Sequence, residues 1–186
     1  ELGMGAFSNC GALTRAEIPE GVEVLPDAVF SECYSLSSVN IPKNTYYIGD
    51  SAFYACYLVS ELTIPKTVTE IGFEAFTDTA WEKNLTGEFV VVGYGILLKY
   101  NGNQETVRIP KKVLEISYAF KDNDTVKYIH FSENIRQIGK GAFYNCKKLL
   151  SVEIPNTVKK LGAMAFFGCE SLNSAVLPEE LSEIGF

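Results

Sequence analysis

The sequence predicts an α/β solenoid, in which coils of about 23 residues stack on one another and bury a shared core. Three observations predict it: phenylalanine returns at a fixed spacing, several other residue types keep the same phase, and each period contains one alternating apolar segment. The chain has 186 residues, of which 47% are apolar and 21% charged. This ordinary globular composition is compatible with a continuous core.

Phenylalanine marks the period of the repeat. It recurs every 23 residues in two series, which are separated by one irregular step of 44 residues. The two series are Phe7, Phe30, Phe53 and Phe76, followed by Phe120, Phe143 and Phe166. One coil cannot bury its apolar face alone, whereas stacked coils can. A ring at the same point of every coil therefore predicts an interior column.

Other positions keep this phase. A small residue precedes nearly every ring, and all five cysteines follow a ring by three residues. The alternation of Val39 and Ile41 is typical of a half-buried strand, which Pro42 ends because proline cannot donate to a ladder. A V-x-x-I-G segment follows, in which glycine is expected to turn the chain with a positive φ. The A-F-x-x-C stretch is expected to form a helical or 3₁₀ turn.

Residues 77–104 break the period. From Phe76 to the next proline that is in phase, the chain runs 34 residues where twelve is normal, an excess close to one coil. Within this insertion, Phe89–Val92 and Ile96–Tyr100 flank Gly93-Tyr94-Gly95. Two alternating or apolar runs around a glycine turn predict a β-hairpin.

The combined pattern L-x-x-V-x-I-P-x-x-V-x-x-I-G-x-x-A-F-x-x-C resembles the BspA-like leucine-rich repeat, the bacterial surface protein type. The resemblance covers nearly the whole chain and implies a right-handed leucine-rich-repeat superhelix over residues 1–186 as a single domain. It also implies a secreted or cell-surface bacterial protein, and it brings no catalytic residues. Because both ends of the chain fall at the same phase of the repeat, we expect a fragment of a longer array.

Several classes of function are disfavoured by composition. A formal net charge of -7 disfavours nucleic acid as a partner, and without an apolar run of about 18 residues we expect no membrane insertion. The five cysteines have no zinc-site spacing, and we expect a ladder of buried thiols rather than a metal site or disulfides. His130 is the only histidine. Without a second base or a placed nucleophile, we expect no enzyme and no cofactor.

The outward positions of the repeated strand form two columns on one face, and this face is the candidate binding surface. Its middle brings together Arg108, Tyr128 and His130, residue types that are enriched in interface hot spots. Thr106 and Glu153 occupy neighbouring positions of the same columns. The five residues are the predicted ligand-binding set. The alternative is that they are ordinary exposed strand residues.

Two functions remain open from the sequence. The first is a non-catalytic binding or adhesion module that recognises a protein or glycan through the strand face, with host extracellular matrix among the partners considered. The second is a structural spacer that presents other domains of a longer chain. A binding array should concentrate aromatic residues and arginine on one face, and a spacer should not.

Overall fold

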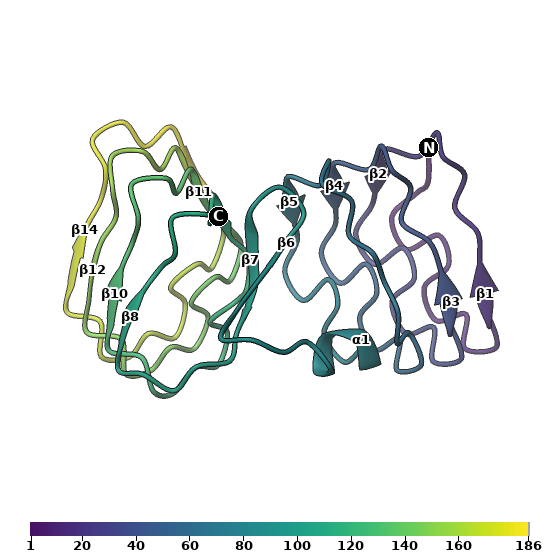
Figure 1. Ribbon diagram of the computed structural model, residues 1–186, viewed down its shortest axis with the longest axis horizontal. Helices are drawn as coiled ribbons and strands as arrows, with labels where there is room; N and C mark the ends of the chain where they lie inside the picture. The colour runs from purple at the N-terminus through teal and green to yellow at the C-terminus, as the bar shows by residue number, and fades with distance from the viewer. Residues whose placement is uncertain (186) are drawn as a thin grey trace. The chain divides into compact units, whose positions relative to one another are not determined.

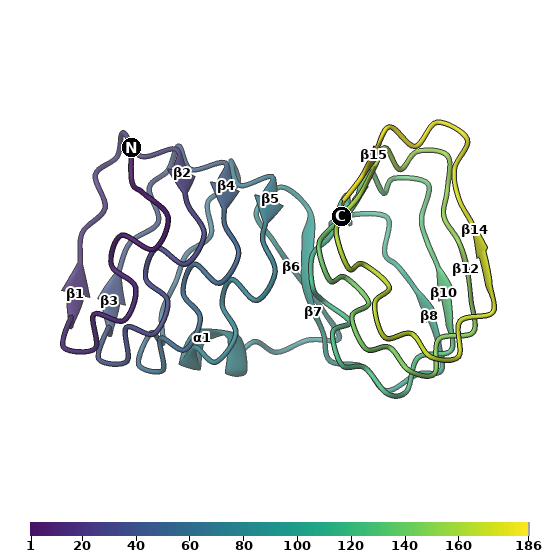
Figure 2. The ribbon, with the colours of Figure 1, turned by 180° about the vertical axis from the view of Figure 1, so that it is seen from behind.

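The structure, a computed structural model that describes residues 1–185, consists of coils that repeat at the predicted period (Figures 1 and 2). It divides into two compact units. Unit 1 comprises residues 1–86 with 92–94, and unit 2 comprises residues 87–91 with 95 to the end of the described chain. The predicted solenoid is confirmed within each unit. That the chain forms one domain stays a prediction.

Unit 1 has two small parallel sheets. Strands β1 (Arg15–Ala16) and β3 (Ser38–Val39) form one sheet, with Arg15 opposite Ser38. The second sheet has the order β2 (Val24–Leu25), β4 (Tyr47–Ile48) and β5 (Glu70–Ile71). Each strand is paired with the equivalent strand of the next coil, so residues opposite one another are one period apart.

Unit 2 repeats this arrangement with more strands. A four-stranded sheet contains β8 (Thr106–Arg108), β10 (Tyr128–His130), β12 (Ser151–Glu153) and β14 (Ser174–Val176), which lie side by side in Figures 1 and 2. A second sheet runs β6 (Phe89–Val92), β7 (Ile96–Tyr100), β9 (Glu115–Ile116), β11 (Gln137–Ile138), β13 (Lys160–Leu161) and β15 (Glu183–Ile184). Within this sheet, β7 pairs in parallel with β9, β9 with β11, β11 with β13, and β13 with β15.

The A-F-x-x-C stretches form runs of β-turns instead of the predicted helical or 3₁₀ turns. In the coil around Phe53, the Tyr54 N–H donates to the Ser51 carbonyl at 3.1 Å, while the Phe53 N–H donates to the Ala75 carbonyl of the next coil at 2.7 Å. Ser51 and Ala55 have left-handed φ angles of 52° and 57°. Left-handed residues on both sides of the ring interrupt helical geometry. Alternate N–H groups therefore bond within the coil and to the next one.

The insertion contains the one α-helix of the described residues and the predicted hairpin. Helix α1 (Ala80–Lys83) begins at Thr79, whose side chain accepts the Glu82 N–H at 3.0 Å. Strands β6 and β7 have the predicted bounds and are neighbours in their sheet. Gly93 and Gly95 between them have φ angles of 52° and 78°, which glycine adopts without a steric cost.

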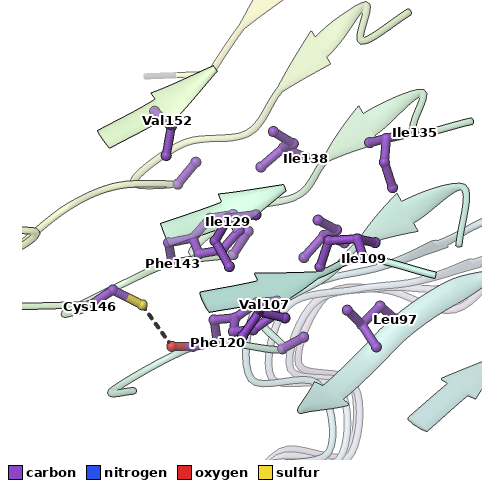
Figure 3. Packing of buried hydrophobic residues seen from close by; sticks show 14 of the residues in the cluster. Leu97, Val107, Ile109, Phe120, Ile129, Ile135, Ile138, Phe143, Cys146 and Val152 are labelled. Atoms are coloured by element: carbon purple, nitrogen blue, oxygen red, sulfur yellow. Dashed lines mark hydrogen bonds between the residues drawn. The ribbon is translucent and has the colours of Figure 1, made fainter. Parts of the chain in front are cut away.

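The phenylalanine rings form a stacked column inside each unit. Ring centroids in unit 1 lie 5.3–5.6 Å apart from Phe7 to Phe76, and those of unit 2 lie 5.0 and 5.2 Å apart from Phe120 to Phe166. Figure 3 shows Phe120 and Phe143 among the aliphatic side chains of the core. The insertion supplies the neighbouring aromatic residues, since Trp81 packs edge-on against Phe76 and Tyr100 lies against Phe120, each at 4.9 Å.

The cysteines are free thiols whose hydrogen bonds join successive coils. The Cys146 Sγ donates to the Phe120 carbonyl one coil earlier at 2.9 Å (Figure 3). The same bond forms from Cys33, Cys56 and Cys169. The expected buried ladder is confirmed for Cys33, Cys56 and Cys146, whereas Cys10 is exposed and Cys169 is partly buried.

The glycine of the V-x-x-I-G segment is required for a reason other than the predicted positive φ. Gly72 and Gly162 have no left-handed φ. A Cβ built on Gly72 would lie closer than 3.0 Å to the backbone nitrogen of Asp50 in the preceding coil. The prediction was wrong because the constraint comes from the close approach of the adjacent coil, which a single coil's sequence pattern does not show.

Replacing a ring of the column should destabilise the fold strongly. Phe143 is fully buried, and Phe143→Ala should lower the free energy of unfolding by about 3–5 kcal/mol through lost transfer energy and the resulting cavity. Phe167→Ala is the control, because Phe167 is 57% exposed and should cost about 1 kcal/mol or less. Urea unfolding followed by circular dichroism measures both, and equal midpoints would contradict the register.

Adding one methyl group between coils should also destabilise. Gly72→Ala must displace backbone of the preceding coil, and we expect a loss of about 1–3 kcal/mol in the free energy of unfolding. Gly21→Ala serves as the matched control, because a Cβ there meets nothing within 4 Å. Thermal unfolding of the two variants should separate them by several degrees. If both variants have the melting temperature of the wild type, the close approach of Gly72 to the preceding coil is not a constraint.

Stability should fall at high pH through the buried thiols. Burial raises the pKa of the Cys56 thiol from 9.0 to about 12. The folded state therefore holds this proton after the unfolded state has lost it, so the stabilisation is complete below pH 9.0 and is lost as pH rises toward about 12. Unfolding free energies measured across this range should decline less steeply for Cys56→Ala than for the wild type. Equal slopes for the variant and the wild type would contradict this prediction.

Candidate binding surface

The candidate surface is the outward face of the sheet β8-β10-β12-β14 in unit 2. In β8 and β10 the central residue is buried and the two flanking residues are exposed. Val107, Ile129 and Val152 point into the core because side chains alternate along a strand. The same alternation turns Tyr128 and His130 toward solvent, as the sequence predicted.

The strand register arranges the outward residues in two rows. Thr106, Tyr128, Ser151 and Ser174 form the first row. In the second row Arg108 lies opposite His130, and Glu153 lies opposite Val176. The pairing of Tyr128 with Ser151 places His130 beside Glu153. Adjacent strands are about 4.8 Å apart, so each row is a closely spaced line of side chains on a hydrogen-bonded sheet.

A hollow of about 650 Å³ lies over this face. It is lined from β10 to β14 and by the segments that follow β12 and β14. Tyr128 is 43% exposed and supplies an aromatic side of the hollow, while Val176 and Leu177 supply an exposed apolar side. Glu153 and Glu179 add carboxylates. The lining thus combines an aromatic ring, apolar side chains and charges.

The second row carries polar side chains that are not paired with one another. Arg108, His130 and Glu153 make no ion pair or side-chain hydrogen bond within residues 1–185. By contrast, Lys127 at the margin of the sheet is paired with Glu105 at 2.7 Å. A guanidinium, an imidazole and a carboxylate thus stand in order across three strands, with their hydrogen-bonding groups available to a partner.

Three of the five predicted residues line the hollow and two flank it. Tyr128, His130 and Glu153 belong to the lining. Thr106 and Arg108 lie on β8 at the edge of the same sheet, opposite Tyr128 and His130, but do not line the hollow. The structure therefore brings the five residues onto one face. Ligand binding by them stays a prediction.

Comparison with known protein families identifies the repeat. A family model described as the BspA type leucine rich repeat region matches residues 1–85 and 98–186, in six copies. The chain belongs to this family. The unmatched residues 86–97 lie within the insertion that holds the β6–β7 turn. The BspA-type repeat is a leucine-rich repeat, in keeping with the stacked coils of about 23 residues in this chain.

Solved structures of bacterial leucine-rich-repeat proteins match the chain, and one of them shares its fold. The pneumococcal vaccine antigen PcpA matches with a TM-score of 0.55 and 23% identity, over 93% of this chain and 47% of that chain. A leucine-rich repeat protein from Bacteroides ovatus (TM-score 0.43, 18% identity) matches over 98% of this chain and 77% of its own. A leucine rich cell surface protein from Faecalibacterium prausnitzii (TM-score 0.43, 24% identity) matches over 92% and 62%. No curated protein matches the chain.

The hollow extends to residues that the sequence reading missed. Phe131 takes the place of the isoleucine of the BspA-type strand, and its ring packs edge-on against Phe143 at 6.0 Å. Asn156 accepts the Glu179 N–H at 3.3 Å and so joins the segments after β12 and β14. Phe131 followed by Ser132, where proline is usual, was the available signal of a departure here.

The described residues offer no arrangement that points to metal or acid–base chemistry. No group of three His, Cys, Asp or Glu residues within residues 1–185 is placed to hold a metal ion. His130 has no hydrogen-bonded hydroxyl or carboxylate beside it in the same range. The one helix of residues 1–185, α1, has neither the length nor the apolar character to span a bilayer.

Proposed function

We propose that the chain is a non-catalytic binding module, which recognises a protein ligand through the strand face of unit 2. The observation that carries the proposal is the hollow beside Tyr128, His130 and Glu153, where unpaired polar groups adjoin exposed apolar side chains. Protein interfaces typically combine a desolvated aromatic or apolar centre with polar groups around it. A repeat scaffold that serves interaction is compatible with this role.

The backbone under the hollow favours the binding function over the spacer function. All four strands are held in one parallel ladder, so the side chains of both rows are presented at fixed spacing before a ligand arrives. Little conformational entropy is then lost on binding. A spacer needs no such gathering of Tyr128, His130 and Glu153 on one face, and the spacer function therefore becomes the alternative if no ligand is found.

The mixed character of the lining favours a protein over a glycan. Val176 and Leu177 are 55% and 50% exposed and give an apolar area beside Tyr128. The neighbouring carboxylates Glu153 and Glu179 would pair with lysine or arginine of a ligand. The net charge of -7 would steer a basic protein surface toward the module at low salt. Host extracellular matrix proteins are the proposed partner class.

We further propose that the module lies outside the bacterial cell, secreted or displayed at the surface. The BspA-type repeat supports this location, because the resemblance implies surface proteins. Brief trypsin treatment of intact cells that express the natural protein should release peptides of the repeat. Peptides seen only after lysis would contradict this location.

The central test is a variant in which the side chains of Tyr128 and His130 are both replaced by alanine. Tyr128→Ala/His130→Ala should weaken binding to a matrix protein such as fibronectin or collagen by about thirtyfold or more, as loss of interface hot spots does. Surface plasmon resonance over a panel of matrix proteins identifies the ligand with the wild type and then compares the variant. Its melting temperature should stay near that of the wild type, because both side chains are exposed.

Tyr94→Ala is the matched control. Tyr94 is a 61% exposed tyrosine in the hairpin turn and does not line the hollow, so its removal should not alter affinity. A double variant that folds and binds its protein ligand as tightly as the wild type would overturn the proposal. Binding confined to oligosaccharides would replace the protein ligand with a glycan.

A further inference from the structure

In unit 1, the hydrogen-bonded ladder of β1 and β3 does not continue into the next coil. Strand β3 pairs with β1 on one edge and has no strand on the other. The segment that follows in the next coil, residues 60–64, makes no backbone hydrogen bond to any described residue. At the equivalent place in unit 2, the Ile109 N–H donates to the His130 carbonyl at 2.9 Å. Two stretches of backbone in unit 1 are thus left with unpaired N–H and carbonyl groups.

A second hollow, of about 550 Å³, lies at this interruption. It is lined by residues 39–41, by residues 60–63 and by Trp81. All of these residues belong to unit 1. Unpaired backbone groups at a sheet edge are a template for another strand. The hollow therefore places that template beside an aromatic side chain.

Trp81 is the only tryptophan of the chain, and its polar group is unpartnered. The residue is 9% exposed, packs edge-on against Phe76, and is held by its backbone N–H on the Val59 carbonyl at 2.8 Å. Its indole N–H donates no hydrogen bond to any residue in 1–185. Tryptophan at binding sites usually donates this N–H to an acceptor. Because Trp81 lines the hollow, its N–H is free to bond an acceptor on a ligand there.

The side chain of Asn40, the residue after β3, bonds to the coil that contains β1. The Asn40 amide accepts the Ile18 N–H at 2.7 Å and donates to the Ile18 carbonyl at 2.8 Å, as a paired strand residue would. This edge is therefore satisfied, and the edge toward residues 60–64 is the open one. Glu61 lines the hollow, is exposed and makes no ion pair with a described residue.

We propose that this hollow binds an extended, basic segment of a partner protein. The segment adds its backbone to the unpaired groups of residues 39–41 and 60–63, in the manner of β-strand addition. One of its carbonyl oxygens accepts the Trp81 indole N–H, and a lysine or arginine faces Glu61. Alternating donors and acceptors along two backbone stretches match a polypeptide better than a sugar ring. The site is separate from the surface on β8 to β14.

The single tryptophan makes the test direct. We would titrate the intact chain with a blocked hexapeptide of alternating lysine and valine and follow the tryptophan emission. Binding should change the intensity and wavelength of emission saturably, because the indole N–H gains an acceptor. Amide hydrogen exchange should slow at residues 60–64 in the same titration. No change in either signal at millimolar peptide would overturn the proposal.

Two altered probes separate backbone pairing from other modes of binding. The same hexapeptide with N-methylated amides cannot pair with a strand edge, and a glutamate–valine hexapeptide opposes Glu61. Both should bind at least about tenfold more weakly than the lysine peptide. Equal binding of the methylated peptide, or saturable binding of cellohexaose in place of the peptides, would contradict a β-strand ligand.

Variants of the site complete the experiment, with a fluorescein-labelled lysine peptide and anisotropy as the readout. Trp81→Phe keeps an aromatic ring against Phe76 but removes the N–H, and should weaken binding about fivefold. Glu61→Gln should weaken it by a similar factor at low salt and less at high salt. Glu133→Gln makes the same charge change at an exposed turn of unit 2, and Tyr128→Ala/His130→Ala alters the other surface. Both should bind like the wild type, and loss of binding in either would contradict a separate site.

Discussion

Each coil of this protein is stable only because its neighbour satisfies its backbone. The strands are two to five residues long, and the turns around each phenylalanine direct alternate N–H groups to the next coil, as Phe53 does to Ala75 at 2.7 Å. The ring column and the thiol bonds occupy the same interface, where Cys146 Sγ reaches the Phe120 carbonyl and the rings lie about 5 Å apart. Any residue at this interface must therefore suit two coils at once.

Much of the fold follows from the sequence because this interface repeats. The phenylalanine spacing predicted the coil, and two glycines between alternating runs predicted the β6–β7 hairpin with its observed bounds. The conformation of the turns was not predictable, because Ser51 and Ala55 adopt left-handed φ angles that non-glycine residues take only when tertiary bonds hold them there. The role of Gly72 was misread for the same reason, since its constraint lies in the preceding coil.

Both hollows lie where a coil departs from the BspA-type pattern. In unit 2, Phe131 and Ser132 replace the usual isoleucine and proline, and in unit 1 Trp81 enters from the insertion. The outward direction of Tyr128 and His130 was predictable from alternation alone. The parts contributed by Asn156 and Trp81 were not, because they depend on how segments from different periods meet. In this protein, the two proposed binding surfaces therefore lie at irregular coils.

The most direct measurement of the stacked-coil account is a nuclear Overhauser experiment on protein with labelled phenylalanine rings. The account predicts ring-to-ring cross-peaks between residues one period apart, such as Phe30 with Phe53 and Phe120 with Phe143, whose centroids lie 5.6 and 5.0 Å apart. It also predicts none between Phe7 and Phe53, which are two periods apart. Rings that show no contact at one period, or contacts at other separations, would contradict it.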